Sequence, residues 1–194
     1  NSSTLWLLDT KTQKVRRISK RPLNMVISFW PYEWKKDSSG LVINSAVNID
    51  RNPPDEKIDS IVPVIQESDG KKAPVRTYQN LLATPHDEAL FEFYGEGQIY
   101  QISLKGKEKK LGKSGLIKNI SISPDGKNIL ISKIEKPFSY QVSLGRLPTR
   151  WILLNKRGKK IKQVAFQPLA ENIPKGFDSV RTGRRSIQWR DDKP

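Results

Sequence analysis

The sequence contains no cysteine, one histidine and one methionine among its 194 residues. Without cysteine, disulfides and thiolate chemistry are excluded. A single histidine leaves only scattered carboxylates as metal ligands, so we expect neither a metal site nor a cofactor. No apolar run reaches the roughly 20 residues of a membrane-spanning helix, and residues 1–10 lack the basic start and apolar core of a signal peptide. The sequence therefore predicts a chain without cofactor, metal or membrane span.

The sequence also lacks the motifs of a hydrolase or nucleotide site. A serine hydrolase presents its nucleophile in a G-x-S-x-G turn, and the stretch 112–115 (GKSG) is one residue short of that motif. The only histidine, His86, follows Pro85 at an expected helix start, where a capping or surface role is favoured. A phosphate-binding loop needs four residues between its glycines, whereas Gly106 and Gly112 are separated by five. We therefore expect no catalytic residue in this chain.

The positive charge is confined to one half of the sequence. Residues 98–194 carry 22 Lys and Arg against 7 Asp and Glu, whereas residues 1–97 carry 13 of each, so the second half supplies the whole net charge of +15. Such a surface attracts acidic ligands, nucleic acid or an acidic domain, although lysines also simply protect sheet edges. Nucleic-acid binding calls for aromatic stacking platforms, and the lysine-rich turns 105–113 and 156–162 have none. Nucleic acid is therefore not an expected partner.

Residues 117–134 predict a β-hairpin. Ile120 and Ile122 alternate with polar residues, a Ser-Pro-Asp-Gly turn follows at 123–126, and Ile129 and Ile131 resume the alternation. The turn suits its residues, because proline presets φ at the first corner and glycine tolerates a positive φ. A strand, this turn and an apolar strand are typical of β-propeller blades.

A second hairpin pattern occurs three times. Residues 5–18, 99–111 and 151–161 each contain an apolar strand, a polar turn and a return strand. Short polar side chains that can close a turn fall at equivalent places in the three copies; they are Asp9, Ser103 and Asn155.

The spacing of these copies indicates the architecture. Asp9 and Ser103 are 94 residues apart, and Ser103 and Asn155 are 52 apart, while a four-stranded propeller blade takes roughly 40–50 residues. We expect residues 1–194 to be an all-β fragment of one β-propeller, about three blades of four antiparallel strands, that begins and stops inside blades. The long first interval favours an insertion at 44–95, although two blades with one eroded would also fit. Open blades leave strand edges that could self-associate.

The expected insertion at 44–95 contains a helix. Thr84 at the N-cap, Pro85 at the first helical position and Asp87 returning a hydrogen bond predict its start. Gly95 would end it, and one face would present three apolar residues, Ala89, Leu90 and Phe93.

Two arginine clusters remain. Arg181, Arg184 and Arg185 surround Gly183 on a loop, and a second pair, Arg146 and Arg150, flanks Leu147-Pro148. The planar guanidinium suits bidentate recognition of carboxylates, although these arginines could equally pair internally or face water.

Three stretches of the chain resemble one known family. These are VPVIQESDGKKAPVRTYQNLLATPHDEALFEFY at 62–94, KPFSYQVSLGRLPTR at 136–150 and QPLAENIPKGFDSVRTGRRSIQWRDDKP at 167–194, the last departing from the family pattern at Gln167. They resemble the β-propeller part of the prolyl oligopeptidase family of serine peptidases, and its bacterial and chloroplast glutamyl peptidase branch in particular. The resemblance implies a parent protein in which the propeller caps a C-terminal α/β-hydrolase domain that cleaves peptides after glutamate. That catalytic domain is absent from this chain, and the family favours a periplasmic or secreted bacterial location.

An acidic substrate side chain needs a positive partner, so the sequence predicts substrate-binding residues among the arginines of these stretches: Arg76, Arg181, Arg184 and Arg185. The expected partners are a peptide substrate, whose access the propeller would gate, and the catalytic domain of the same protein. Two alternatives stay open. One is a non-catalytic propeller scaffold that binds a protein through the 44–95 insertion, and the other is a polyanion binder that uses the basic second half.

Overall fold

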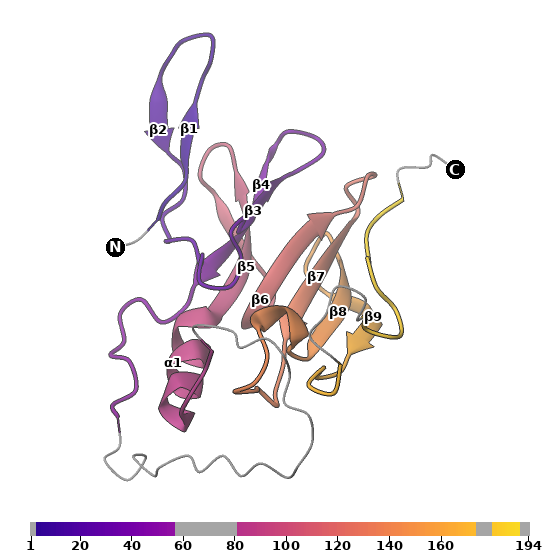
Figure 1. Ribbon diagram of the computed structural model, residues 1–194. Coiled ribbons are helices and arrows are strands. Elements are labelled where there is room, and N and C mark those ends of the chain that lie inside the picture. The colour runs from indigo at the N-terminus through magenta and orange to yellow at the C-terminus, as the bar shows by residue number, and fades with distance from the viewer. Residues whose placement is uncertain (1–2, 57–80, 174–179, 191–194) are drawn as a thin grey trace, which may run out of the picture.

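The computed structural model describes residues 3–56, 81–173 and 180–190, which form a curled antiparallel sheet, a separate hairpin and a helix (Figure 1). The hairpin comprises β1 (Trp6–Leu8) and β2 (Val15–Arg17). The sheet contains β3 (Tyr32–Trp34), β4 (Gly40–Ala46), β5 (Glu96–Ser103), β6 (Glu108–Ile122), β7 (Asn128–Ile134), β8 (Thr149–Asn155) and β9 (Lys160–Gln167). The helix α1 spans Pro85–Gly95 and a 3₁₀ turn, η2, spans Leu144–Arg146.

The seven strands lie in the sheet in their order along the chain, from β3 to β9. Every neighbouring pair is antiparallel. The all-β expectation is therefore confirmed, and these seven strands join in one continuous sheet.

The 15-residue strand β6 makes the sheet curl. Its first part pairs with β5 as far as Leu116, which lies opposite Glu96, and its second part pairs with β7 from Leu116 onward. Gly112 has a φ of 62°, and a register shift lies between Ile117 and Asn119. Positive φ values and bulges bend a strand and increase its twist. As a result β6 belongs to two four-stranded meanders, β3–β4–β5–β6 and β6–β7–β8–β9.

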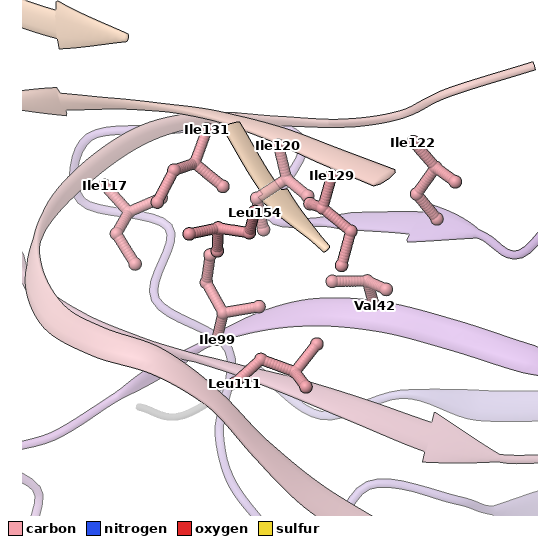
Figure 2. Packing of buried hydrophobic residues seen from close by; sticks show 9 residues of the cluster. All are labelled: Val42, Ile99, Leu111, Ile117, Ile120, Ile122, Ile129, Ile131 and Leu154. Carbon is pink, nitrogen blue, oxygen red and sulfur yellow. The ribbon is translucent and has the colours of Figure 1, made fainter. Parts of the chain in front are cut away.

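The main core fills the concave side of the curl. The two predicted isoleucine pairs face each other across β6 and β7, with Ile120 opposite Ile131 and Ile122 opposite Ile129. Figure 2 shows them pointing toward side chains of the first meander. Each such side chain contributes about 1.5–3 kcal/mol when it is fully buried. The cluster consists of Val42, Ile99, Leu111, Ile117, Ile120, Ile122, Ile129, Ile131 and Leu154.

A few residues in and beside the N-terminal hairpin pack on the opposite face of β4 and β5. Because alternate residues of β4 enter different clusters, six consecutive residues of this strand are buried. Val42 enters the main core, while the other face packs with Ile18 from the segment after β2. This second cluster comprises Ile18, Leu41, Ile43 and Ile102.

The predicted hairpin turns are confirmed in their side-chain detail. Asp9 Oδ1 accepts hydrogen bonds from the amides of Lys11 and Thr12, at 2.9 and 3.0 Å. Ser103 and Asn155 accept equivalent bonds from residues later in their own turns. In the Ser-Pro-Asp-Gly turn at 123–126, glycine adopts a φ of 69° as predicted.

The connections at the two ends of the sheet differ in length. Four tight turns, 35–39, 104–107, 123–127 and 156–159, lie at one end, which we call the turn end (Figure 1). Backbone hydrogen bonds link neighbouring turns, from Leu104 N to Ser39 O and from Lys156 N to Lys127 O. The opposite end, which we call the loop end, carries α1 and the 135–148 connection with η2.

One boundary of the insertion differs from the sequence prediction. Asn44, its expected first residue, lies inside β4, which continues to Ala46. The pairing of Asn44 with Ile99 of β5 keeps the chain extended there. Residues 57–80 of the insertion, including the expected extended run 61–65, lie outside the described residues.

Candidate functional site

The loop end brings together the described parts of the three stretches that carry the family resemblance. Phe91 of α1 packs edge-to-face against Phe138 of the 135–148 connection, with ring centroids 5.2 Å apart. Lys136 Nζ and Glu92 Oε2 form an ion pair at 2.9 Å between the same two elements. The segment 180–190 reaches this surface through Arg181. Regions far apart in the sequence therefore build one surface.

Helix α1 begins as the sequence predicts. Thr84 Oγ1 accepts the amide of Asp87 at 3.1 Å, and Asp87 Oδ2 accepts the amide of Thr84 at 3.0 Å. Hydrogen bonds from backbone amides, that of Ala83 foremost, lower the pKa of the Asp87 carboxyl. The helix ends at Gly95, also as predicted. This capping box fixes where the helix enters the site.

The apolar face of α1 differs from the predicted one. Phe91, which the prediction omits, packs into the loop-end cluster, while Phe93 lines a separate cavity next to the 22–26 segment. The difference comes from tertiary packing. Helix α1 lies between two apolar surfaces, and some of its apolar residues contact one surface while others contact the second. A single predicted stripe does not describe such a helix.

A cavity of about 370 Å³ lies between α1 and the 135–148 connection. Its walls are mostly apolar, and Asp87 and Ser139 contribute polar atoms. An apolar cavity with a few polar groups is the usual form of a ligand site. The remaining lining residues are Leu81, Leu82, Leu90, Phe91, Val142, Leu144 and Leu147.

Arg181 is held in place by backbone carbonyls. Its Nη1 donates to Gly145 O at 3.1 Å, and its Nη2 donates to Arg146 O and Pro168 O at 2.6 and 2.7 Å. Burial and the neighbouring Arg146 lower the pKa of Arg181. Because two of its nitrogens are occupied, Arg181 ties the C-terminal segment to η2 and to the chain after β9.

The other three predicted substrate-binding arginines differ from one another in their surroundings. Arg184 Nη1 donates to Val164 O at 2.6 Å, so it too anchors the C-terminal segment to β9. Arg185 is exposed and has no hydrogen-bond or ion-pair partner within the described ranges. Arg76 lies outside the described residues. Arg181 and Arg184 thus both bind backbone carbonyls in or near β9, and Arg185 lies on the surface.

The two arginines of the second cluster, Arg146 and Arg150, also have partners in the structure. Arg150 makes a bidentate ion pair with Glu135, with Nε–Oε1 and Nη2–Oε2 distances of 2.5 and 2.6 Å, and this carboxylate raises the pKa of Arg150. The Arg150 guanidinium also lies 4.8 Å from the centroid of the Phe166 ring. Arg146 Nη1 donates to the carbonyls of Ala170 and Ile173. These two arginines therefore connect chain segments that meet at the loop end.

The register shift of β6 holds Lys118, a half-buried cation that the sequence prediction did not consider. Burial, followed by the charge of Arg181, lowers the pKa of the Lys118 ammonium. A sequence signal does exist: Leu116 and Ile117 are adjacent apolar residues, which breaks the alternation of the strand and indicates a bulge.

The described ranges contain no group of three or more His, Cys, Asp or Glu side chains that could hold a metal ion. In the same part of the chain, no helix is long and apolar enough to cross a membrane.

No protein-family model matches the chain. The chain is 34% identical over 193 residues to a protein of Oryza sativa subsp. japonica named "Probable glutamyl endopeptidase, chloroplastic", and this match covers 98% of the chain. It is 32% identical over 198 residues to the Arabidopsis thaliana protein of the same name, a match that covers 100% of the chain. In both cases the chain spans only 20% of the relative's length. The chain is thus similar, along essentially its whole length, to one segment of two proteins named as peptidases.

Proposed function

We propose that this chain is a β-propeller segment of a serine peptidase of the prolyl oligopeptidase family that cleaves peptides after glutamate, and that the segment is not catalytic alone. The observation that carries the proposal is the similarity along 98% of the chain to a protein named as a glutamyl endopeptidase. The absence of a G-x-S-x-G motif from the sequence agrees with a catalytic centre elsewhere in the parent protein.

The strand arrangement supports the propeller part of the proposal. Each meander that shares β6 contains four antiparallel strands, which is the composition of a propeller blade. The two meanders pack face to face through the main core, as neighbouring blades do. The hairpin β1–β2 would then be the outer part of a preceding blade.

The loop end is the surface that we assign to substrate access. It carries the long connections and the apolar cavity beside α1. Function concentrates in such connections when a rigid sheet positions them. In this proposal the loop end faces the catalytic domain and gates the peptide, while Arg181 and Arg184 hold the segment that presents Arg185. Arg76 stays a proposed contact of the acidic side chain.

The test uses the full-length parent protein. Matched reporter peptides with Glu, Gln or Leu before the scissile bond would be compared, with the isolated 194-residue chain as a control. We expect Glu-selective turnover by the parent protein and none from the isolated chain. Turnover of all three peptides at equal rates would contradict the Glu preference, and the absence of turnover would contradict the peptidase assignment.

A second cavity favours a second candidate, a non-catalytic scaffold that binds a protein partner. This cavity, of about 520 Å³, lies between the 22–26 segment and the insertion, and its lining includes the exposed apolar residues Met25, Val26, Ile49 and Tyr94. Exposed apolar residues around a cavity are typical of protein contacts. Under this reading, the parent protein would turn over none of the three peptides, and Ile49→Asp would abolish capture of a partner from the native extract.

Self-association through the edge strands β3 and β9 is a further part of the proposal, because unpaired backbone groups there can pair with a second sheet. Light scattering of the parent protein across a tenfold concentration range tests it. A constant monomer mass would contradict it.

A further inference from the structure

The turn end of the sheet carries a cavity of about 610 Å³ with a basic lining, between the 17–20 segment and the 104–107 turn. Its described lining contains no carboxylate. Glu108, which follows the turn, already accepts hydrogen bonds from Lys20 N and Arg21 Nε, one on each oxygen. A ligand in this cavity would therefore meet positive charge without an opposing acid. The lining cations are Arg17, Lys20, Lys105 and Lys107.

A second cavity at the turn end, of about 360 Å³, lies between the two meanders. Residues of the 35–39, 123–127 and 156–159 turns line it, and four of them are lysines. Its two carboxylates, Asp37 and Asp125, accept hydrogen bonds from amides and hydroxyls of their own turns. The lining therefore keeps an excess of positive charge. The lysines are Lys35, Lys36, Lys127 and Lys156.

The two cavities belong to one continuous surface along the turn end (Figure 1). A hydrogen bond from Leu104 N to Ser39 O joins the turn beside the first cavity to a turn beside the second. The second cavity in turn reaches the 123–127 and 156–159 turns. We call this surface, from the 17–20 segment to the 156–159 turn, the basic strip. Such a row of cations suits an elongated partner that carries negative charge.

The residues of the basic strip favour the carboxylates of a polypeptide over nucleic acid or a membrane. Within the described residues, neither lining contains an aromatic side chain on which the bases of a single strand would stack. The aliphatic residues of the two linings are buried, so none of them is available to enter lipid. Arg17 is the one arginine among the lining cations. Lysine is a flexible point charge, whereas the fork of arginine suits bidentate binding of phosphate.

We propose that the basic strip binds an acidic segment of a protein partner, whose Glu and Asp side chains enter the two cavities. This inference goes beyond the proposed function, because the strip lies at the end of the sheet opposite the surface assigned to substrate access. The cations of the strip are mostly solvent-exposed, so each contact is weak and the affinity comes from several contacts together. Salt should weaken such binding.

The first experiment measures binding of a fluorescent peptide of alternating D-Glu and D-Ser to the full-length parent protein by anisotropy. D-residues keep a peptidase from cleaving the probe, so the result does not depend on turnover. A peptide of alternating D-Gln and D-Ser is the neutral control. We expect binding of the D-Glu peptide alone, and its loss at high salt. No binding of the D-Glu peptide, or equal binding of both peptides, would overturn the proposal.

Charge reversal locates the binding surface. Lys105→Glu combined with Lys107→Glu changes the first cavity, and Lys127→Glu combined with Lys156→Glu changes the second. All four lysines are exposed, so the fold should tolerate these changes. We expect each pair to raise the Kd of the D-Glu peptide about 10-fold, because each removes two exposed ion pairs.

The matched control is Lys113→Glu combined with Lys162→Glu. It changes the net charge by the same amount at exposed positions that line neither cavity. The control should leave the Kd nearly unchanged. An equal loss of affinity in the control would show a response to net charge alone, and an unchanged Kd in both cavity pairs would place the binding elsewhere. Either result would overturn the proposal.

A measurement on the unmodified parent protein needs no variant. The D-Glu peptide should protect Lys105 and Lys156 from reductive methylation, read by peptide mass, and should leave Lys113 and Lys162 reactive. Equal protection at all four positions would contradict the basic strip. In the same anisotropy assay, oligothymidylate and vesicles of phosphatidylglycerol compete with the peptide. Tighter binding of either competitor would assign the strip to nucleic acid or to a membrane and overturn the proposal.

Discussion

The turn end and the loop end of the curled sheet are closed by different kinds of contact. At the turn end, side chains bond to amides within two to five residues along the chain, as Asn155 does with Arg157 and Lys159. At the loop end, the contacts join distant residues, such as Phe91 with Phe138 and Arg181 with Gly145. Each tight turn is therefore specified mainly by its own residues, with hydrogen bonds between turns added once the strands pair. The loop end, in contrast, exists only after the sheet has formed.

This difference explains why a functional surface would form at the loop end. A tight turn of four or five residues has little freedom to vary without changing the strand register. Long connections over a fixed sheet can change their residues while the strands keep their places. The following predictions test this contrast, beginning with the largest expected effect.

Phe138→Ala should destabilise the loop end by about 3–5 kcal/mol, because it removes a buried aromatic side chain from the cluster that holds α1. Hydrogen exchange of the α1 amides in the full-length protein should accelerate strongly, while the amides of the 123–127 turn stay protected. Phe29→Ala is the control, since Phe29 is 75% exposed and should cost little. Equal acceleration at both ends of the sheet would contradict the contrast.

Gly158→Ala should destabilise the turn end by about 2–4 kcal/mol, because a Cβ at φ 85° would lie 2.7 Å from the backbone of Gly112 and Leu111. Gly106→Ala is the matched control. Its φ is 79°, but the nearest atom, Ile18 O, is 3.5 Å away, so only the conformational cost of about 1 kcal/mol applies. Chemical denaturation of the two variants measures the difference. Equal losses would show that close packing beneath Gly158 is unimportant.

Arg181→Gln should cost about 1.5–3 kcal/mol, the range for hydrogen bonds from a charged group. The loss should be local, with faster proteolysis between residues 180 and 190, because three carbonyls lose their donor. The exposed Arg185→Gln should leave proteolysis unchanged. Increased cleavage in both variants would argue against a specific anchor at Arg181.

The smallest effect is expected from Asp37 at the turn end, through the dependence of the stability on pH. The hydroxyl and amide of Ser39 and the ammonium of Lys35 lower the pKa of Asp37 from 3.8 to about 2. A carboxyl whose pKa is lower in the folded state stabilises the fold above its unfolded pKa. That contribution disappears as the pH falls through the folded pKa. Asp37→Asn should therefore flatten the decline in stability between about pH 5 and about pH 2, measured by the denaturation midpoint. An unchanged slope would contradict the role of Asp37.

Local patterns predicted the hairpins and the start of α1 well. The alternating isoleucines of 120–131, the polar residues Asp9, Ser103 and Asn155, and the Thr84–Asp87 capping box all act within a few residues, and each is confirmed. The interactions that close these structures lie within the window that a pattern samples.

Long-range contacts explain what the sequence could not predict. Arg181 and Arg184 donate to backbone carbonyls, and no residue pattern encodes such a contact. The apolar residues of α1 divide between two partners that are brought to it by β6 and by the 22–26 segment.

The order of the strands has a consequence for biosynthesis. Because β3 to β9 lie in the sheet in chain order, each strand pairs with the one made just before it. The longest delay falls on β5, which pairs with β4 only after the whole 47–95 connection has left the ribosome. Until then β4, with six consecutive buried positions, presents an apolar edge to its surroundings. The synthesis of this connection is thus the interval in which the nascent chain has most need of protection from aggregation.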